Sequence, residues 1–206
     1  MMDTVTVRQI SAEEKQNIER VVQIHLDTFT GFFLTFMGRG FLRQMYGCYC
    51  CHTPSGLLGA FDEQGQLLGF AAYSGDMSGL YKYMLRKRLI PFAWYSLGAF
   101  LRKPKVFLRL IRAFLKPSES KREEAYVELS SIGVAPAAKG RGIGSRLLAH
   151  VKQITDDSRY AYVALETDAR NNESANRFYR KNGFTLVRTY ETREGRSMNE
   201  YRFEGM

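Results

Sequence analysis

One stretch of the chain restricts its fold more than any other: residues 129–148, with the sequence LSSIGVAPAAKGRGIGSRLL. It begins as a strand, turns at three glycines in alternate positions, Gly140, Gly142 and Gly144, and continues as a helix. The glycines leave backbone N–H groups uncovered where the helix begins, and the helix dipole adds partial positive charge there. A turn of this kind can hold a pyrophosphate.

Other phosphate-binding loops fit this stretch less well. Its G-x-G-x-G spacing differs from the G-x-G-x-x-G of dinucleotide folds, and the Gly-Lys-Ser/Thr ending of nucleotide hydrolases is absent. The order of residues resembles the GNAT (general N-acetyltransferase) superfamily, whose signature is V-x-P-x-x-[R/Q]-x-x-G-x-[G/A]. Val134, Pro136, Gly142 and Gly144 match it, and Lys139 departs from it, because the family usually has Arg or Gln there.

A second motif lies downstream, in residues 172–184, with the sequence NESANRFYRKNGF. It is similar to the closing motif of the same superfamily, N-x-x-A-x-x-[FL]-Y-x-K-x-G-F, at the expected distance from the first. The two motifs together cover roughly residues 126–184, and the first third of the chain matches only in its pattern of elements.

The resemblance implies an α/β fold with a central mixed, twisted sheet of about seven strands flanked by helices. With 206 residues, the chain is long enough for one well-filled core, so we expect a single domain over residues 1–206. A basic helical insertion is expected at about 78–118, between strands three and four.

Hydrophobic periodicity places the other elements. It predicts a first strand at 5–10, a helix from Ser11, and a second helical stretch after a break at 31–33. It also predicts a hairpin at 57–73, strands at 125–134, 160–166, 184–187 and 200–203, and helices after the glycine turn and after Asn172.

The resemblance implies acetyl-CoA as the acetyl donor. In this superfamily backbone N–H groups grip the pyrophosphate, and the thioester arm lies between the fourth and fifth strands, which splay apart. The residues implied for this site are Ile132, Gly133, Val134, Lys139, Gly140, Arg141, Gly142, Ile143, Gly144, Ser145, Asn172 and Tyr179. Because backbone groups supply most of the grip, Lys139 should weaken the match only slightly.

Acetyl transfer to an amine needs one group to deprotonate the ammonium and another to protonate the leaving thiolate. Tyr179 matches the tyrosine that donates this proton in many GNAT enzymes. A phenol pKa near 10 is close enough to a thiol pKa near 8.5 for the proton to pass from the phenol to the thiolate. Glu128 has the offset from Val134 at which histone acetyltransferases place their base. Glu166 lies close to where amino-terminal acetyltransferases place theirs. We favour Glu128, and three alternatives stay open: Glu166, a water-mediated route, and no general base.

The resemblance indicates an N-acetyltransferase that acts on a primary amine by direct attack in a ternary complex, without a covalent enzyme intermediate. The acceptor stays unidentified; an amino sugar or another small amine is one hypothesis. Phe29, Phe32 and Phe33 fall where the loop between the first two helices lines the acceptor site in GNAT proteins, although such aromatics are more often buried for core packing than for binding. The alternative function is a non-catalytic acyl-CoA sensor or a membrane-peripheral interaction module.

The net charge of +9 is concentrated in one region. Residues 81–116 contain ten Lys or Arg and no Asp or Glu, and outside them the basic residues nearly balance the acidic ones. Within this region, 89–101 is uncharged and too short to cross a bilayer, so we expect a buried or interfacial segment. A basic amphipathic helix is expected to follow Pro104, with Lys105, Arg109, Arg112 and Lys116 on one face.

Three interpretations of residues 81–116 stay open: a solvated surface, contact with an anionic membrane, and capture of an acidic substrate or partner. No nucleic-acid-binding module is recognisable, so no nucleic acid is expected. The sequence leaves the oligomeric state open, a homodimer included.

Three cysteines cluster at 48–51, next to His52. The cluster is too tight for a disulfide framework, and no second pair of ligands is spaced for zinc, so we expect reduced thiols and no metal. The first residues have no basic region followed by an apolar core, which argues against a secretory signal. We therefore expect a cytoplasmic protein, with peripheral membrane contact as an open addition.

Overall fold

The computed structural model describes residues 4–30, 32–102, 104–105, 124–154, 159–192 and 195–205. Its strands form one open seven-stranded sheet in the order β1-β2-β3-β4-β5-β7-β6. The strands are β1 (Thr6–Gln9), β2 (Ser55–Phe61), β3 (Leu67–Ser74), β4 (Tyr126–Val134), β5 (Tyr162–Asp168), β6 (Thr185–Glu191) and β7 (Ser197–Glu204). Only the β4–β5 pair is parallel, so the predicted mixed sheet is confirmed.

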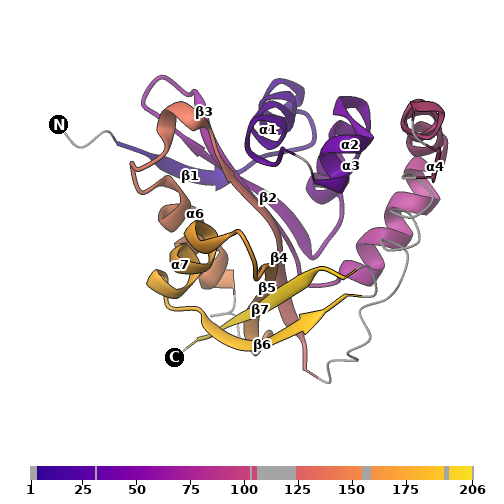
Figure 1. Cartoon of the computed structure of the whole chain (residues 1–206). Helices are drawn as coiled ribbons and strands as arrows, with labels where there is room; N and C mark the ends of the chain where they lie inside the picture. The colour runs from indigo at the N-terminus through magenta and orange to yellow at the C-terminus, as the bar shows by residue number, and fades with distance from the viewer. Residues whose placement is uncertain are drawn as a thin grey trace.

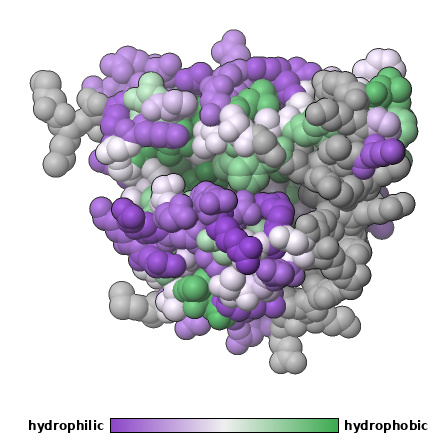
Figure 2. All heavy atoms as spheres, in the orientation of Figure 1, coloured by the Kyte–Doolittle hydropathy of each residue, from purple (hydrophilic) through white to green (hydrophobic). Residues whose placement is uncertain are grey.

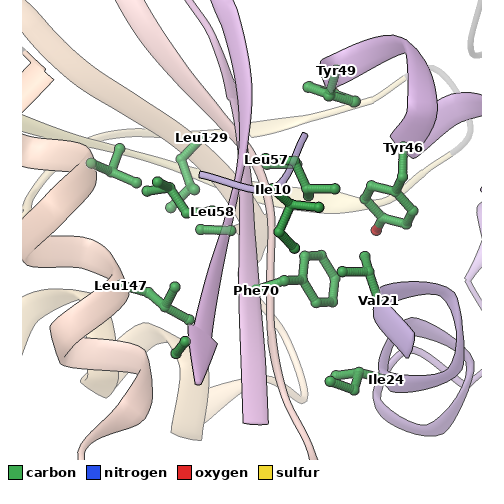
Figure 3. Packing of buried hydrophobic residues seen from close by; sticks show 14 of the residues in the cluster. Ile10, Val21, Ile24, Tyr46, Tyr49, Leu57, Leu58, Phe70, Leu129 and Leu147 are labelled. Carbon is green, nitrogen blue, oxygen red and sulfur yellow. The ribbon is translucent and has the colours of Figure 1, made fainter. Parts of the chain in front are cut away.

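Helices cover both faces of the sheet (Figure 1). The helices are α1 (Lys15–Thr28), α2 (Phe33–Met37), α3 (Arg39–Cys51), α4 (Met77–Arg102), α6 (Ile143–Gln153) and α7 (Glu173–Lys181), with a short 3-10 turn, η1 (Pro136–Ala138). We call the side of α1 to α4 the α1 side, and the side of α6 and α7 the α6 side. Tyr46 and Phe70 pack on the α1 side, whereas Leu129 and Leu147 pack on the α6 side (Figure 3).

The first helix begins four residues later than the sequence predicts. The Glu14 carboxylate accepts hydrogen bonds from the Ser11 N–H (2.9 Å) and from the Arg8 guanidinium (2.9 and 2.7 Å), which fixes a turn before the helix. The predicted second helix is divided into α2 and α3, because Gly38 between them has φ 89°, outside the helical range.

The insertion between β3 and β4 begins with the long helix α4. Its backbone leaves helical geometry at Arg88 (φ −134°, ψ 17°), three residues before Pro91, so α4 is kinked. The predicted basic helix after Pro104 cannot be followed, since residues 106–123, with Arg109, Arg112 and Lys116, lie outside the described residues. In the described ranges no helix is both long and apolar enough to span a bilayer.

The parallel strands β4 and β5 stop pairing before either strand ends. Their last paired residues are Glu128 and Ala164, but β4 continues to Val134 and β5 to Asp168. A bulge at Ser130 adds to the separation, because Leu129 pairs with Tyr73 and Ser131 with Ala72, which leaves Ser130 unmatched. We call the space between residues 129–134 and 165–168 the fork.

Candidate active site

Backbone groups of β4 face the fork. The Ala135 N–H donates to the Leu68 carbonyl oxygen on β3 (2.8 Å), so alternate residues of β4 direct their N–H and C=O groups toward β3. By the same alternation, Ile132 and Val134 direct theirs toward the fork, where β5 does not pair with them. These amides could bind an extended, polar molecule there.

Gly133 differs from its two neighbours. It pairs with Phe70 of β3, and a Cβ at this position would lie 2.8 Å from the Phe70 ring and 3.5 Å from Ile24. Its backbone therefore faces β3 rather than the fork. The absence of a side chain at Gly133 thus allows the close packing of Phe70 and α1, and its predicted contact with a cofactor stays a prediction.

The glycine turn leads directly into α6, whose N-terminus has no side-chain cap. Gly140 (φ 80°) and Gly142 (φ 74°) adopt left-handed backbone conformations that L side chains disfavour, and a Cβ at either would meet open space. Gly142 is the N-cap, and no side chain caps the helix. Helical geometry leaves the N–H groups of Ile143, Gly144 and Ser145 without intrahelical acceptors, so the turn fits a phosphate group.

The glycine at position 144 is required by helix packing. A Cβ there would lie 2.9 Å from the Phe178 ring of α7, so the missing side chain lets the two helices approach. Lys139, Arg141 and Ser145 are exposed around the turn. The turn therefore combines cationic side chains with backbone donors, and Gly144 ties its position to α7.

The two candidate bases share one face of the sheet. Tyr126 and Tyr162 are paired across β4 and β5, and their rings stack with centroids 5.5 Å apart. Side chains alternate along each strand, so Glu128 lies on that same face, and so does Glu166 on β5. The half-buried Glu128 is at the base of the fork, whereas the exposed Glu166 is two residues further along β5.

Two tyrosines place Glu128 on the α1 side. Burial raises the pKa of both Tyr49 of α3 and Tyr81 of α4, and the negative charge of Glu128 adds to each increase. Ser130 lies close to the same group, since it forms a hydrogen bond with Tyr49. The base of the fork on the α1 side therefore has a carboxylate with hydroxyl groups nearby.

Tyr179 lies on the opposite side of the sheet, in α7. Its ring packs against Phe178, Phe184 and Tyr201, with centroids 5.3, 6.0 and 5.9 Å away. Burial raises the pKa of Tyr179 to about 12, so its hydroxyl is protonated at neutral pH. This is a weaker acid than the free phenol assumed from the sequence, because the folded protein desolvates the phenolate.

A buried network, which the sequence analysis did not identify, holds α7 against the sheet. The Asn176 side-chain oxygen accepts from Asn199 Nδ2 (2.7 Å) and the Tyr201 hydroxyl (2.9 Å). Its Nδ2 donates to the carbonyl oxygens of Asp168 (2.9 Å) and Asn172 (2.7 Å). Asn176 occupies a variable position of the closing motif, so only its place on the buried face of a helix could have drawn attention to it.

Asn172 begins α7 without capping it. Its Nδ2 donates to Thr167 Oγ1 (2.7 Å) at the end of β5, and it makes no side-chain cap hydrogen bond. The side chain thus links α7 to the fork strand. This hydrogen bond gives the Asn172 side chain a structural role that does not depend on a cofactor.

Glu200 was also missed by the sequence analysis. It lies opposite Glu166 in the β5–β7 pair, is fully buried, and accepts from Arg188 Nε (2.7 Å) and Arg202 Nε (3.0 Å). The hydrogen bond with Glu200 raises the pKa of Arg188. A buried carboxylate needs such pairing, and the two guanidinium groups bring positive charge to the face that Glu166 occupies. In the sequence, the alternating charges at Glu200, Arg202 and Glu204 could have indicated a row of charged side chains on one face of this strand.

A third unpredicted group joins α1 to the fork. His25 Nδ1 and the Tyr46 hydroxyl are hydrogen-bonded (2.6 Å), and the Tyr46 hydroxyl lies 3.3 Å from Ser131 Oγ on β4. His25 is 3% exposed, and its Nε2 has no partner among the described residues. Burial lowers the pKa of His25 to about 4, so the ring is neutral at pH 7.

The predicted substrate-lining aromatics differ in position. Phe29 is half-buried against His25 (centroids 4.7 Å), as core packing requires. Phe32 is 41% exposed and lies under Arg196, whose guanidinium carbon is 5.8 Å from the ring centroid. Arg196 in turn donates to the carboxylate of Asp168 at the end of β5 (2.8 and 2.9 Å). Phe32 therefore lies near the open end of the fork, and the Phe33 side chain lies outside the described part.

Two other features lie away from this site. A hollow of about 510 Å³ is bounded by α1, α3 and Arg88 at the kink of α4, and it shares no residue with the fork or the glycine turn. Cys48, Cys50 and Cys51 end α3 as free thiols. Within the described ranges no group of three or more His, Cys, Asp or Glu could hold a metal ion.

Comparison with known proteins identifies the family. The model of the acetyltransferase (GNAT) family matches residues 18–184. A mycothiol acetyltransferase from Mycolicibacterium gilvum is 41% identical over 71 residues, which are 32% of this chain and 23% of that protein. The match thus spans less than a quarter of the relative's length.

Solved structures share the fold at low sequence identity. An N-acetyltransferase from Staphylococcus aureus Mu50 is 16% identical, with a TM-score of 0.60 over 98% of each chain. The NAA60 protein of Arabidopsis thaliana, solved in complex with acetyl-CoA, is 18% identical, with a TM-score of 0.58 over 98% of each chain.

Proposed function

Because this chain belongs to the GNAT family of acetyltransferases, we propose that it moves the acetyl group of acetyl-CoA to a primary amine by direct attack in a ternary complex. The observation that carries the proposal is the fork: β4 and β5 stop pairing at Glu128 and Ala164, beside an uncapped helix start. In this proposal all the described strands act as one acetyltransferase unit, since they share one sheet.

Residues of the turn and of β4 would hold acetyl-CoA. The N–H groups at the start of α6, with Lys139 and Arg141 nearby, suit the pyrophosphate, and the backbone of Ile132 and Val134 suits the pantetheine amides. NAA60 of Arabidopsis thaliana, which shares this fold, was solved with acetyl-CoA. When bound, the donor supplies an acetyl thioester that an amine can attack.

Proton transfer would occur from the two sides of the sheet. On the α1 side, Glu128 takes a proton from the acceptor ammonium and leaves a lone pair on its nitrogen. The nitrogen then bonds to the acetyl carbon, the carbon–sulfur bond breaks, and on the α6 side the Tyr179 hydroxyl gives its proton to the departing sulfur. The second proton that the nitrogen loses in becoming an amide restores the Tyr179 phenol through solvent. The high pKa of Tyr179 makes this transfer favourable only if the sulfur is desolvated as well, which raises the pKa of the thiol too.

Glu128 is the better candidate base for two reasons. It is half-buried at the base of the fork, and Tyr49, Tyr81 and Ser130 lie nearby on the same side of the sheet. Glu166 is exposed, and it lies opposite Glu200, on the face where Arg188 and Arg202 pair with that buried carboxylate.

The acceptor is proposed to be a small polar amine, such as an amino sugar. The hydroxyl groups of Tyr49, Tyr81 and Ser130 near Glu128 suit a ligand with several hydroxyl groups of its own. The mycothiol acetyltransferase relative matches over too little of its length to transfer its acceptor to this chain. We place the enzyme in the cytoplasm, where its free thiols would stay reduced.

The test is acetyl-CoA consumption, measured as released thiol, against amino sugars, nucleotide amino sugars, polyamines, aminoglycosides and peptides. With an active acceptor, Glu128→Gln and Tyr179→Phe should each lower kcat about 100-fold or more. Glu166→Gln should have a smaller effect. The matched controls Glu63→Gln and Tyr83→Phe, at residues to which the proposal assigns no role, should leave kcat unchanged.

The same experiment separates the enzyme from a sensor. Tight binding of acetyl-CoA without turnover on any acceptor would favour a non-catalytic acyl-CoA-binding protein. If wild-type protein did not bind acetyl-CoA at all, the proposal would be refuted. Unchanged kcat in both Glu128→Gln and Glu166→Gln would remove the carboxylate base from the mechanism.

A further inference from the structure

The second half of α4 presents an apolar face to solvent. Five large residues, Leu89, Ile90, Trp94, Leu97 and Leu101, are between 48% and 82% exposed in the described part of the structure. At 3.6 residues per turn they fall within a sector of about 140° on the helix. Hydrophobic side chains are visible at this end of α4, at the upper right of Figure 2. A contiguous exposed stripe of this kind marks an interaction surface.

The opposite side of the same helix is fixed to the protein. The ring of Phe92 packs on Phe41 of α3 (centroids 4.9 Å), and the Tyr95 ring occupies the space beside Gly40, 2.2 Å from where a Cβ would be. Arg43 also donates to the Tyr95 hydroxyl (3.1 Å). The apolar stripe is therefore held outward by a docked helix.

Cations flank the stripe at both ends. Arg86, Lys87 and Arg88 precede it and are exposed, and the exposed Lys105 follows it. The sequence contains no Asp or Glu from residue 77 to residue 118. An apolar face bounded by positive charge, on a segment without acidic residues, is complementary to a surface that is apolar inside and negative outside.

We propose that this face of α4 binds the surface of an anionic lipid bilayer, with the stripe entering the headgroup region and the flanking cations contacting acidic headgroups. A second copy of the chain fits less well. Two α4 helices paired through their stripes would bring the 86–88 cations against the cations that follow the stripe or against themselves, and the sequence from 77 to 118 has no acidic residue to offset that repulsion.

The rest of the fold is compatible with this orientation. α4 lies on the α1 side, whereas the glycine turn and α6 lie on the other side of the sheet (Figure 1). The site proposed for a negatively charged pyrophosphate thus faces away from the negatively charged lipid. Binding to lipid is independent of whether the fork is catalytic, so the two proposals can fail separately.

Trp94 makes a direct test available, because it is the only tryptophan of the chain. The full chain is mixed with phosphatidylcholine vesicles that do or do not contain phosphatidylserine, and Trp94 emission and co-sedimentation are followed. We expect a blue shift and co-sedimentation with the anionic vesicles only, weakened by salt. Arg86→Glu with Lys87→Glu should lower the affinity by about fivefold or more for each charge changed.

Ile90→Asn tests the apolar part of the contact and should lower the vesicle affinity at least tenfold. Val187→Asn is the matched control, an exposed apolar residue of β6, and should leave it unchanged. Equal binding of wild type and Ile90→Asn, or no binding by wild type, would overturn the proposal. Self-association that Ile90→Asn abolishes, without vesicle binding, would overturn it too and assign the face to a second copy.

Discussion

Lowering the pH should destabilise this protein through His25. The folded protein holds the pKa of this buried histidine at about 4, against an ordinary value of 6.5 in the unfolded chain. Above pH 6.5 the ring is neutral in both states, and stability is at its highest with respect to this group. As the pH falls toward 4, the unfolded chain takes up a proton that the folded protein does not bind.

The size of the effect follows from these values. Each pH unit within this window should lower the free energy of unfolding by about 1.4 kcal/mol, and the whole window by about 3 kcal/mol. His25→Asn removes the titrating group and keeps a donor that can reach Tyr46. The variant should therefore lose less stability than wild type on going from pH 7 to pH 4.5.

The assay is urea unfolding at several pH values for wild type, His25→Asn and the control His150→Asn. His150, near the end of α6, is not fully buried, so its replacement should leave the pH dependence unchanged. Comparison between variants cancels the titration of the carboxylates, which all of them share. If His25→Asn loses stability as steeply as wild type, then burial of a neutral His25 is not the cause.

Three further substitutions test the packing around the fork. Asn176→Ala leaves two buried donors of β7 without an acceptor and should cost about 3 kcal/mol in urea unfolding; a loss near zero would contradict the network. Gly144→Ala should cost about 1–3 kcal/mol by pressing on Phe178, whereas Gly98→Ala, a helical position with open space around it, should stabilise by up to about 1 kcal/mol; equal effects would contradict the close approach of the helices. Gly142→Ala must adopt φ 74° and should cost about 1 kcal/mol and raise the KM for acetyl-CoA, and an unchanged KM would argue against a cofactor at this turn.

Much of the fold could be predicted because its signals are local. The hairpin of β2 and β3, the strand before the glycine turn and the helix after it are each encoded by a few neighbouring residues. The local signal failed where a side-chain hydrogen bond or the backbone conformation of a glycine intervened. Glu14 bonds to Arg8 and Ser11 and delays α1, and Gly38 divides a helix that hydrophobic periodicity had continued.

The sequence by itself determined the glycine turn, the order of the elements and the candidate groups Glu128, Glu166 and Tyr179. Only the tertiary structure decided how these residues combine. Strand register and alternation place both carboxylates on the α1 side and Tyr179 on the α6 side, with the fork between them. A motif fixes residues close together in the chain, whereas contacts between distant segments depend on register, helix packing and burial, which a local pattern does not encode.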